Sequence, residues 1–199
     1  MAKKDLSKRK IWQDYSGANA TTAERNFYSV FKNIFKDTIY MIEAKPKVFS
    51  EIYVNIPLDK KTITEIYNPK RKIKKHGISP DYVITNIQSK KKIFIEVKRQ
   101  DGWVEGKSRA AGRGNAHERS CKFFTPGLIK ILRNETKITD ENHLPFWVVF
   151  MGDITRDPCR VREIKCWYND FEKHYFMWRD LKIESLINHF EVKLKNLLD

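Results

Sequence analysis

Two carboxylates and a lysine, at Asp81, Glu96 and Lys98, have the types and the spacing that a metal-dependent phosphodiesterase needs. In an extended strand alternate side chains share a face, so Glu96 and Lys98 point the same way about 7 Å apart, with Val97 turned into the core. Residues 86–92 are polar and turn-prone, so the two flanking segments are expected to form a hairpin that brings Asp81 beside Glu96. The sequence therefore predicts a cluster of two carboxylates and one ammonium group.

Such a cluster has a definite chemical use. Mg²⁺ takes oxygen ligands from one or two carboxylates and completes its shell with water and phosphate oxygens. The compact charge of a lysine can steady the attacking water and the negative charge that develops on phosphorus. A structural role is the alternative, because a Pro-Asp turn and a Glu-x-Lys pair on the wet face of a strand also occur in proteins without this activity.

The composition indicates a globular protein with a polyanionic partner. A chain of 199 residues with 41% hydrophobic and 13% aromatic residues can form one domain with a sizeable core. The 39 Lys and Arg residues exceed the 25 Asp and Glu residues to give a net charge of +14, which favours nucleic acid as the partner. No apolar run approaches the roughly 20 residues of a membrane span, and the N-terminus lacks the apolar core of a signal peptide. We therefore expect no membrane attachment and a cytoplasmic location.

The apolar pattern predicts an α/β fold in which helices flank a central mixed β-sheet. Thr21 or Thr22 can cap a first helix, whose apolar stripe is Phe27, Val30, Phe31, Ile34 and Phe35. Residues 144–151 are continuously apolar, which indicates a central strand covered on both faces. Further elements are expected as a helix at 158–167, a strand at 174–178 and a closing helix that carries Leu186, Ile187, Phe190, Leu194 and Leu197. We find no linker that would divide residues 1–199 into two domains.

Residues 100–120, here called the recognition loop, are rich in Gly, Arg and Lys and have no apolar periodicity, which predicts a long projecting loop. Arg can donate two hydrogen bonds to guanine, Asn can pair with adenine, Glu can accept from exocyclic amines, and a small apolar side chain can touch the thymine methyl. The candidate DNA-binding residues are Arg113, Gly114, Asn115, Ala116, His117, Glu118 and Arg119. The alternatives are an ordinary polar loop, or phosphate contacts that carry no sequence information.

The chain resembles type II restriction endonucleases of the MunI and MfeI kind, and more distantly EcoRI, all of which share the PD-(D/E)XK nuclease core. The resemblance rests on SPD at 79–81, EVK at 96–98 followed by RQDGWVEGK, AGRGNAHERSCK at 111–122, FTPGL, and LPFWVVF followed by GDITRDP. With the MunI and MfeI kind it extends over nearly the whole chain. With EcoRI it is confined to the catalytic hairpin and the GNAxER block.

The resemblance implies a Mg²⁺-dependent homodimer that cuts double-stranded DNA at the palindrome 5′-CAATTG. Cleavage after the first C of each strand would leave 5′-AATT overhangs and 5′-phosphates, in a bacterial cell whose methyltransferase protects the host sites. Carried over by motif position, Asp81 and Glu96 would bind the metal together with the Val97 carbonyl. Lys98 would act on the nucleophilic water.

The same resemblance assigns roles within the recognition loop. Asn115, Ala116, Glu118 and Arg119 would serve the inner AATT, and Arg113 would read the outer C:G pair. The sequence departs from EcoRI at His117, where EcoRI has an apolar residue, so the imidazole either contacts a base or packs. In several nucleases with this core a glutamate of the N-terminal helix reaches the metal site. Glu24 could do so here, although it is also placed to complete the helix cap.

Two other functions are compatible with these motifs. One is a non-catalytic, sequence-specific DNA-binding module whose acidic residues are structural. The other is a structure-specific nuclease for branched junctions or repair that uses the same core. Mg²⁺-dependent cutting of a plasmid that contains CAATTG would exclude the first, and a comparison of a branched junction with a linear duplex would separate the second.

Overall fold

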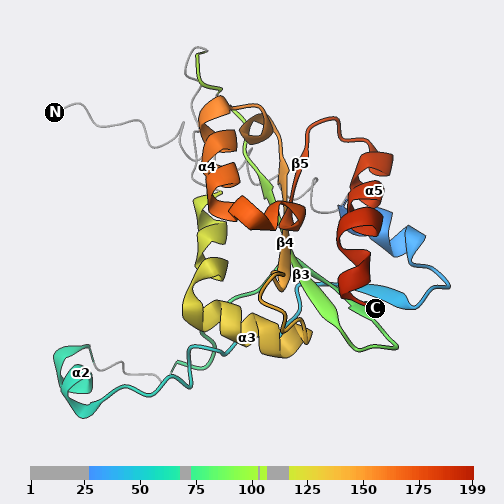
Figure 1. Cartoon of the computed structure of the whole chain (residues 1–199). Helices are drawn as coiled ribbons and strands as arrows, with labels where there is room; N and C mark the ends of the chain where they lie inside the picture. Colours follow the sequence, from blue (N-terminus) through green and yellow to red (C-terminus); the bar gives the residue numbers. More distant parts are fainter. Residues whose placement is uncertain (1–26, 68–72, 103, 107–116) are drawn as a thin grey trace.

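A mixed β-sheet of five strands, in the order β1-β2-β3-β4-β5, forms the centre of the fold (Figure 1). The computed structural model describes residues 27–67, 73–102, 104–106 and 117–199. The strands are β1 Tyr40–Ala44, β2 Tyr82–Asn86, β3 Lys92–Arg99, β4 Phe146–Met151 and β5 Tyr175–Trp178. Strands β1, β2 and β3 pair antiparallel, whereas β3, β4 and β5 pair parallel. The predicted mixed sheet is therefore confirmed.

Helices cover both faces of this sheet (Figure 1). One face carries the helical residues 27–34 and α5, and the other carries α3 and α4. The helices are α2 Lys60–Glu65, α3 Pro126–Thr136, α4 Pro158–Tyr168 and α5 Ile183–Lys193, and the 3₁₀ helices are η1 Glu118–Phe124, η2 Asp153–Thr155, η3 Asn169–His174 and η4 Lys195–Leu197. Each helix in the described part of the chain falls short of the length and apolar character that a bilayer crossing needs.

Local sequence explains where α4 begins. Asp157 is its N-cap, and its side chain accepts a hydrogen bond from the backbone N–H of Cys159. Pro158 occupies the first helical turn, where a missing N–H costs nothing because that group would have no partner inside the helix. The predicted helix at 158–167 and the predicted strand at 174–178 are both confirmed to within one residue at each end.

Two hydrophobic clusters fill the spaces between the sheet and its helices. Every residue of β4 is buried, as the continuously apolar segment predicts, because alternate side chains enter opposite clusters. On the face of residues 27–34 and α5, the Trp147 ring lies 5.6 Å from the ring of Phe27, 6.0 Å from Phe31 and 6.3 Å from Phe190, measured between centroids. On the other face, Phe146, Val148 and Phe150 of β4 belong to the cluster of α3 and α4.

The apolar stripe of the first helix is confirmed: Phe27, Val30, Phe31 and Phe35 are buried and Ile34 packs against the same cluster. The capping residues Thr21 and Thr22, and Glu24, lie outside the described residues.

One prediction needs correction, and one strand was not predicted. The closing helix stops at Lys193, and Leu194 and Leu197 are buried beyond its end. Strand β1 has no counterpart in the sequence prediction. It is an edge strand in which only Ile42 is buried and Met41 is 50% exposed, so its apolar pattern is weak.

Replacement of Trp147 by alanine should lower the free energy of unfolding by about 3–5 kcal/mol, because the side chain is fully buried between β4 and two helical segments. Urea unfolding followed by circular dichroism measures this loss. Val192→Ala on α5 is the control, since Val192 is 62% exposed and should change stability by no more than about 0.5 kcal/mol. Equal effects of the two substitutions would contradict this account of the core.

Candidate active site on the β2–β3 hairpin

The register of the hairpin fixes which side chains meet at its open end. Asn86 organises the turn, because its side-chain oxygen accepts from the N–H groups of Gln88 at 2.9 Å and Ser89 at 3.2 Å. In the antiparallel pairing that follows, Tyr82 lies opposite Ile95. Asp81, one residue before Tyr82, therefore reaches the level of Glu96.

The three residues selected from the sequence converge there. Oδ2 of Asp81 accepts a hydrogen bond from the backbone N–H of Val97 at 2.9 Å. Nζ of Lys98 donates to Oε1 of Glu96 at 2.5 Å and lies 4.0 Å from Oδ2 of Asp81. Asp81 and Glu96 are 6% and 7% exposed. The predicted hairpin and the predicted proximity of the three groups are thus confirmed.

Burial changes the acid–base behaviour of this site. Desolvation raises the pKa of Glu96, the charge of nearby Asp81 raises it further, and Lys98 and Lys122 act in the opposite direction. Oε2 of Glu96 is buried and has no hydrogen-bond partner among the residues that the structure describes. Burying a carboxylate oxygen without a hydrogen-bond partner costs free energy, and a hard cation that the oxygen coordinates would offset that cost.

The donor set suits a divalent cation that keeps part of its water shell. In the described ranges, no group of three or more His, Cys, Asp and Glu side chains gathers in a metal-binding arrangement. A cation at this site would therefore rest on two carboxylates, with a backbone carbonyl, water and substrate oxygens as further ligands. That is the ligand set of a metal that bridges a protein and a phosphate rather than one enclosed by protein.

A second lysine, which sequence reasoning missed, also contacts the site. Nζ of Lys45 lies 2.5 Å from Oδ1 of Asp81, and the backbone N–H of Lys45 donates to the Asp81 carbonyl at 2.8 Å. Lys45 directly follows β1 and has a left-handed backbone with φ of 49°. Because β1 was not predicted, nothing in the sequence placed Lys45 near Asp81.

The recognition loop is only partly described. Arg113, Gly114, Asn115 and Ala116 lie outside the described residues.

The three described candidates of this loop lie at its C-terminal end, where Glu118 and Arg119 are exposed. His117 is 0% exposed, forms a hydrogen bond with Oε2 of Glu163 at 3.0 Å, and stacks on the Trp167 ring at 5.3 Å between centroids. Of the two roles left open for His117, the structure shows packing.

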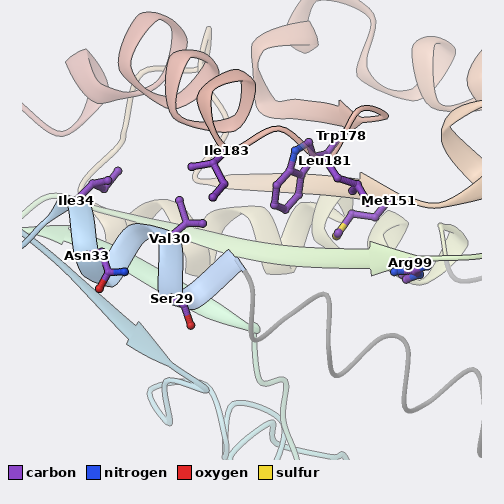
Figure 2. Close-up of a pocket in the computed structure, with 9 residues that line it drawn as sticks. All are labelled: Ser29, Val30, Asn33, Ile34, Arg99, Met151, Trp178, Leu181 and Ile183. Atoms are coloured by element: carbon purple, nitrogen blue, oxygen red, sulfur yellow. The ribbon is translucent and has the colours of Figure 1, made fainter.

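A pocket on the opposite face of the sheet is unrelated to the carboxylates. It is a cavity of about 420 Å³ between the helical residues 27–34 and the C-terminal ends of β4 and β5 (Figure 2). Val30, Met151 and Trp178 line it and belong to the hydrophobic cluster of that face, while Arg99 lies at one end. Glu96 and Lys98 point to the other face, because alternate residues of β3 do so.

Comparisons with known proteins agree with the motifs. The family described as "Type II restriction enzyme MunI" matches residues 1–199. The curated Type II restriction enzyme MunI of Mycoplasma sp is 52% identical over 202 residues, which cover 100% of both sequences. A solved structure, described as the crystal structure of MunI restriction endonuclease in complex with cognate DNA, is similar with a TM-score of 0.81 and 51% identity, over 94% of this chain and 97% of that chain.

These similarities confirm the resemblance inferred from the sequence, and they confirm the restriction-endonuclease core. Restriction endonucleases generally use a divalent metal ion, which is what the two carboxylates of this site suit. The chain belongs to the MunI family of type II restriction enzymes.

Proposed function

We propose that this enzyme hydrolyses double-stranded DNA at 5′-CAATTG with Mg²⁺, cutting after the first C of each strand to leave 5′-AATT overhangs and 5′-phosphates. The observation that supports the chemistry best is the meeting of Asp81, Glu96 and Lys98 on one hairpin, where one oxygen of Glu96 has no hydrogen-bond partner within the described part of the chain. The support for the site sequence is the GRGNAHER block and the 52% identity to MunI.

Asp81, Glu96 and the carbonyl of Val97 would hold the metal. When bound, Mg²⁺ would lower the pKa of a coordinated water and polarise the scissile phosphate. The N–H of Val97 fixes the orientation of the Asp81 carboxylate, because it donates to Oδ2. Lys45 contacts the other oxygen, Oδ1, and offsets part of its negative charge.

Lys98 is the group that we assign to the reacting atoms. Its side chain is 15% exposed and its ammonium group is already oriented by Glu96. From there it can donate a hydrogen bond to the attacking water or to a phosphate oxygen. The water oxygen then forms a bond to phosphorus and releases a proton to solvent, while the bond to the 3′ oxygen in line with it breaks and that oxygen takes up a proton from solvent. The ammonium stabilises the additional negative charge of this transition state.

Sequence recognition is assigned to the recognition loop. Arg113, Gly114, Asn115 and Ala116 are proposed to contact the bases together with Glu118 and Arg119, whose side chains are exposed. Arg113 would read the outer C:G pair, and Asn115, Ala116, Glu118 and Arg119 would read the inner AATT. We assign His117 to the support of this loop, because its ring is buried against Trp167. Glu24 would either complete the cap of the first helix or reach the metal site from it.

The proposed substrate also bears on the oligomeric state of the enzyme and on where it acts. A palindromic site suits a two-fold symmetric protein, so we propose a homodimer in which each copy of the chain is one nuclease domain. The net charge of +14 supports binding to the DNA backbone. A restriction enzyme endangers its own genome, so we place it in the bacterial cytoplasm beside a methyltransferase that modifies CAATTG.

Asp81→Ala should lower the cleavage rate by at least about a hundredfold while DNA binding is largely retained, because the substitution removes a metal ligand but no base contact. Gel analysis of a plasmid with CAATTG measures cleavage, and a mobility shift measures binding. Asp170→Ala is the matched control, since Asp170 is exposed and lies in η3. Normal turnover by the Asp81 variant would remove this residue from the chemistry.

The same assay separates the two other candidate functions. DNA that the wild-type protein retards but leaves intact in Mg²⁺ would indicate a binding module. Faster cutting of a branched junction than of a linear duplex would indicate a structure-specific nuclease. Sequenced ends that begin with 5′-AATT would support the proposed site and the proposed position of the cut.

Cleavage at limiting Mg²⁺ should increase with pH through the raised pKa of Glu96 and level off above it. The protonated carboxyl cannot bind the cation, and its proton persists to a higher pH than that of an ordinary glutamate. Because metal and proton compete for the same oxygens, a higher Mg²⁺ concentration should move the midpoint to lower pH. Single-turnover rates across pH at two Mg²⁺ concentrations test this. A midpoint that Mg²⁺ does not move would assign the titration to another group.

A further inference from the structure

One stretch of chain, residues 153–167, contacts both ends of the recognition loop. We infer that this stretch, here called the clamp segment, holds the recognition loop in position for DNA, and that Glu163 is its main positioning residue. The inference deepens the proposed function, since it takes the loop to be the part of the enzyme that reads the bases.

Two carboxylates of the clamp segment hold the N-terminal end of the loop by accepting hydrogen bonds from its backbone N–H groups. The N–H of Gly102 donates to Oδ2 of Asp153 at 2.8 Å, and the N–H of Glu105 donates to Oδ1 of Asp157 at 3.3 Å. Asp157 also caps α4 through the N–H of Cys159. The start of the loop and the start of α4 therefore share one carboxylate.

A glycine allows this approach. Gly152, directly before the clamp segment, has φ of 80°, and a Cβ atom there would lie 2.8 Å from the carbonyl oxygen of Gln100. The N–H of Ile154 donates to that same carbonyl at 3.1 Å. The end of β4 thus packs so closely against the first residues of the loop that a side chain at position 152 would not fit.

The C-terminal end of the loop is held by a partly buried side-chain cluster, in which His117 is 0% exposed and the side chain of Glu163 is 35% exposed. Nε2 of His117 lies 3.0 Å from Oε2 of Glu163, and Nη1 of Arg160 donates to the same oxygen at 2.7 Å. The His117 ring stacks on Trp167 with an angle of 14° between the planes. Oγ of Ser120 donates to the His117 carbonyl at 2.6 Å, which fixes the next turn of backbone.

The charges in this cluster are compatible with a stable hydrogen bond at neutral pH. Burial, and then the neighbouring Arg160, lower the pKa of His117, so the imidazole is neutral and donates from Nε2. Burial alone would raise the pKa of Glu163, but hydrogen bonds from Arg160 and His117 more than offset it and the pKa is lowered. An ionised Glu163 thus accepts from a neutral His117.

The position of this cluster explains its effect on recognition. His117 directly precedes Glu118 and Arg119, whose side chains are exposed, and it follows the four other proposed base-contacting residues. Holding the His117 backbone limits the places that these side chains can reach. A loop that is ordered before it meets DNA loses less conformational freedom on binding, and a preorganised loop discriminates between sites more sharply.

Two residues that adjoin this cluster in the sequence, Lys122 and Tyr168, interact electrostatically with Glu96. Lys122, the fifth residue of η1, acts electrostatically on Glu96. Tyr168, the last residue of α4, is fully buried and is influenced by the charge of Glu96. The cluster therefore lies on the same face of the sheet as the catalytic groups, whereas the apolar pocket of Figure 2 lies on the other face.

Glu163→Ala tests the role of the clamp segment in recognition. We expect it to reduce the ratio of kcat/KM for CAATTG to kcat/KM for sites with one altered base pair by about tenfold or more, a loss comparable to that of one base contact. The change should lie mainly in KM, because the catalytic groups are untouched. Glu163→Gln keeps an oxygen that can accept from His117 and should restore much of the ratio. Glu184→Ala is the control, since Glu184 is exposed on α5, across the sheet.

A second pair of measurements separates positioning from loss of folding. His117→Phe retains a ring against Trp167 but removes the hydrogen bond, so it should reduce discrimination like Glu163→Ala, and the double variant should be no worse than either single one. In the free protein, hydrogen exchange at residues 117–120 should accelerate in Glu163→Ala while exchange in β4 stays unchanged. Accelerated exchange in β4 as well would mean that Glu163 supports the fold as a whole and would overturn the inference.

The outcomes distinguish this inference from the proposed function. If Glu163→Ala and His117→Phe discriminate between sites as the wild type does, the clamp segment does not position the loop and the inference fails, while the proposed function stands. If the wild type does not cut CAATTG, the proposed function fails. Hydrogen exchange at residues 117–120 still decides whether Glu163 holds this end of the loop, and unchanged exchange there would also overturn the inference.

Discussion

The antiparallel register of β2 against β3 is the constraint on which the rest of the site depends. It places the Asp81 carboxylate against the N–H of Val97 and at the level of Glu96. A slip of one residue would turn Glu96 and Lys98 toward the apolar cluster of the opposite face and bring Val97 out in their place. The turn at Asn86 and the burial of alternate β3 residues both resist such a slip.

The rest of the fold supports the hairpin that carries the two buried carboxylates, Asp81 and Glu96. Strand β4 pairs parallel with β3 along its whole length and is buried on both faces, so the hairpin is supported from its neighbour and from the helices behind it. Lys45 and Lys98 supply positive charge that offsets part of the negative charge of the two buried carboxylates. The raised pKa of Glu96 reflects the cost of burying its charge, and a cation held at the proposed metal site would offset that cost.

The parts of this arrangement that the sequence predicted are those set by local pattern. The hairpin follows from residues close together in the chain, and β4, α4 and β5 follow from strong apolar patterns with clear turn and cap residues. Two contacts of the site were not predictable in this way. Lys45 meets Asp81 across 36 positions, and His117 meets Glu163 across 46, and each depends on the packing of whole elements. The first contact was not predictable because the apolar pattern of β1 is too weak to indicate a strand. The second was not predictable because it depends on how α4 packs against His117.

The central claim is that Asp81 and Glu96 jointly bind the divalent cation used in cleavage. Anomalous diffraction from crystals of the wild-type protein soaked in Mn²⁺, a substitute for Mg²⁺ with a measurable anomalous signal, tests it most directly. The account predicts a peak in contact with a carboxylate oxygen of each residue. A peak that touches neither carboxylate, or one that persists unchanged in crystals of the Glu96→Gln variant, would contradict it.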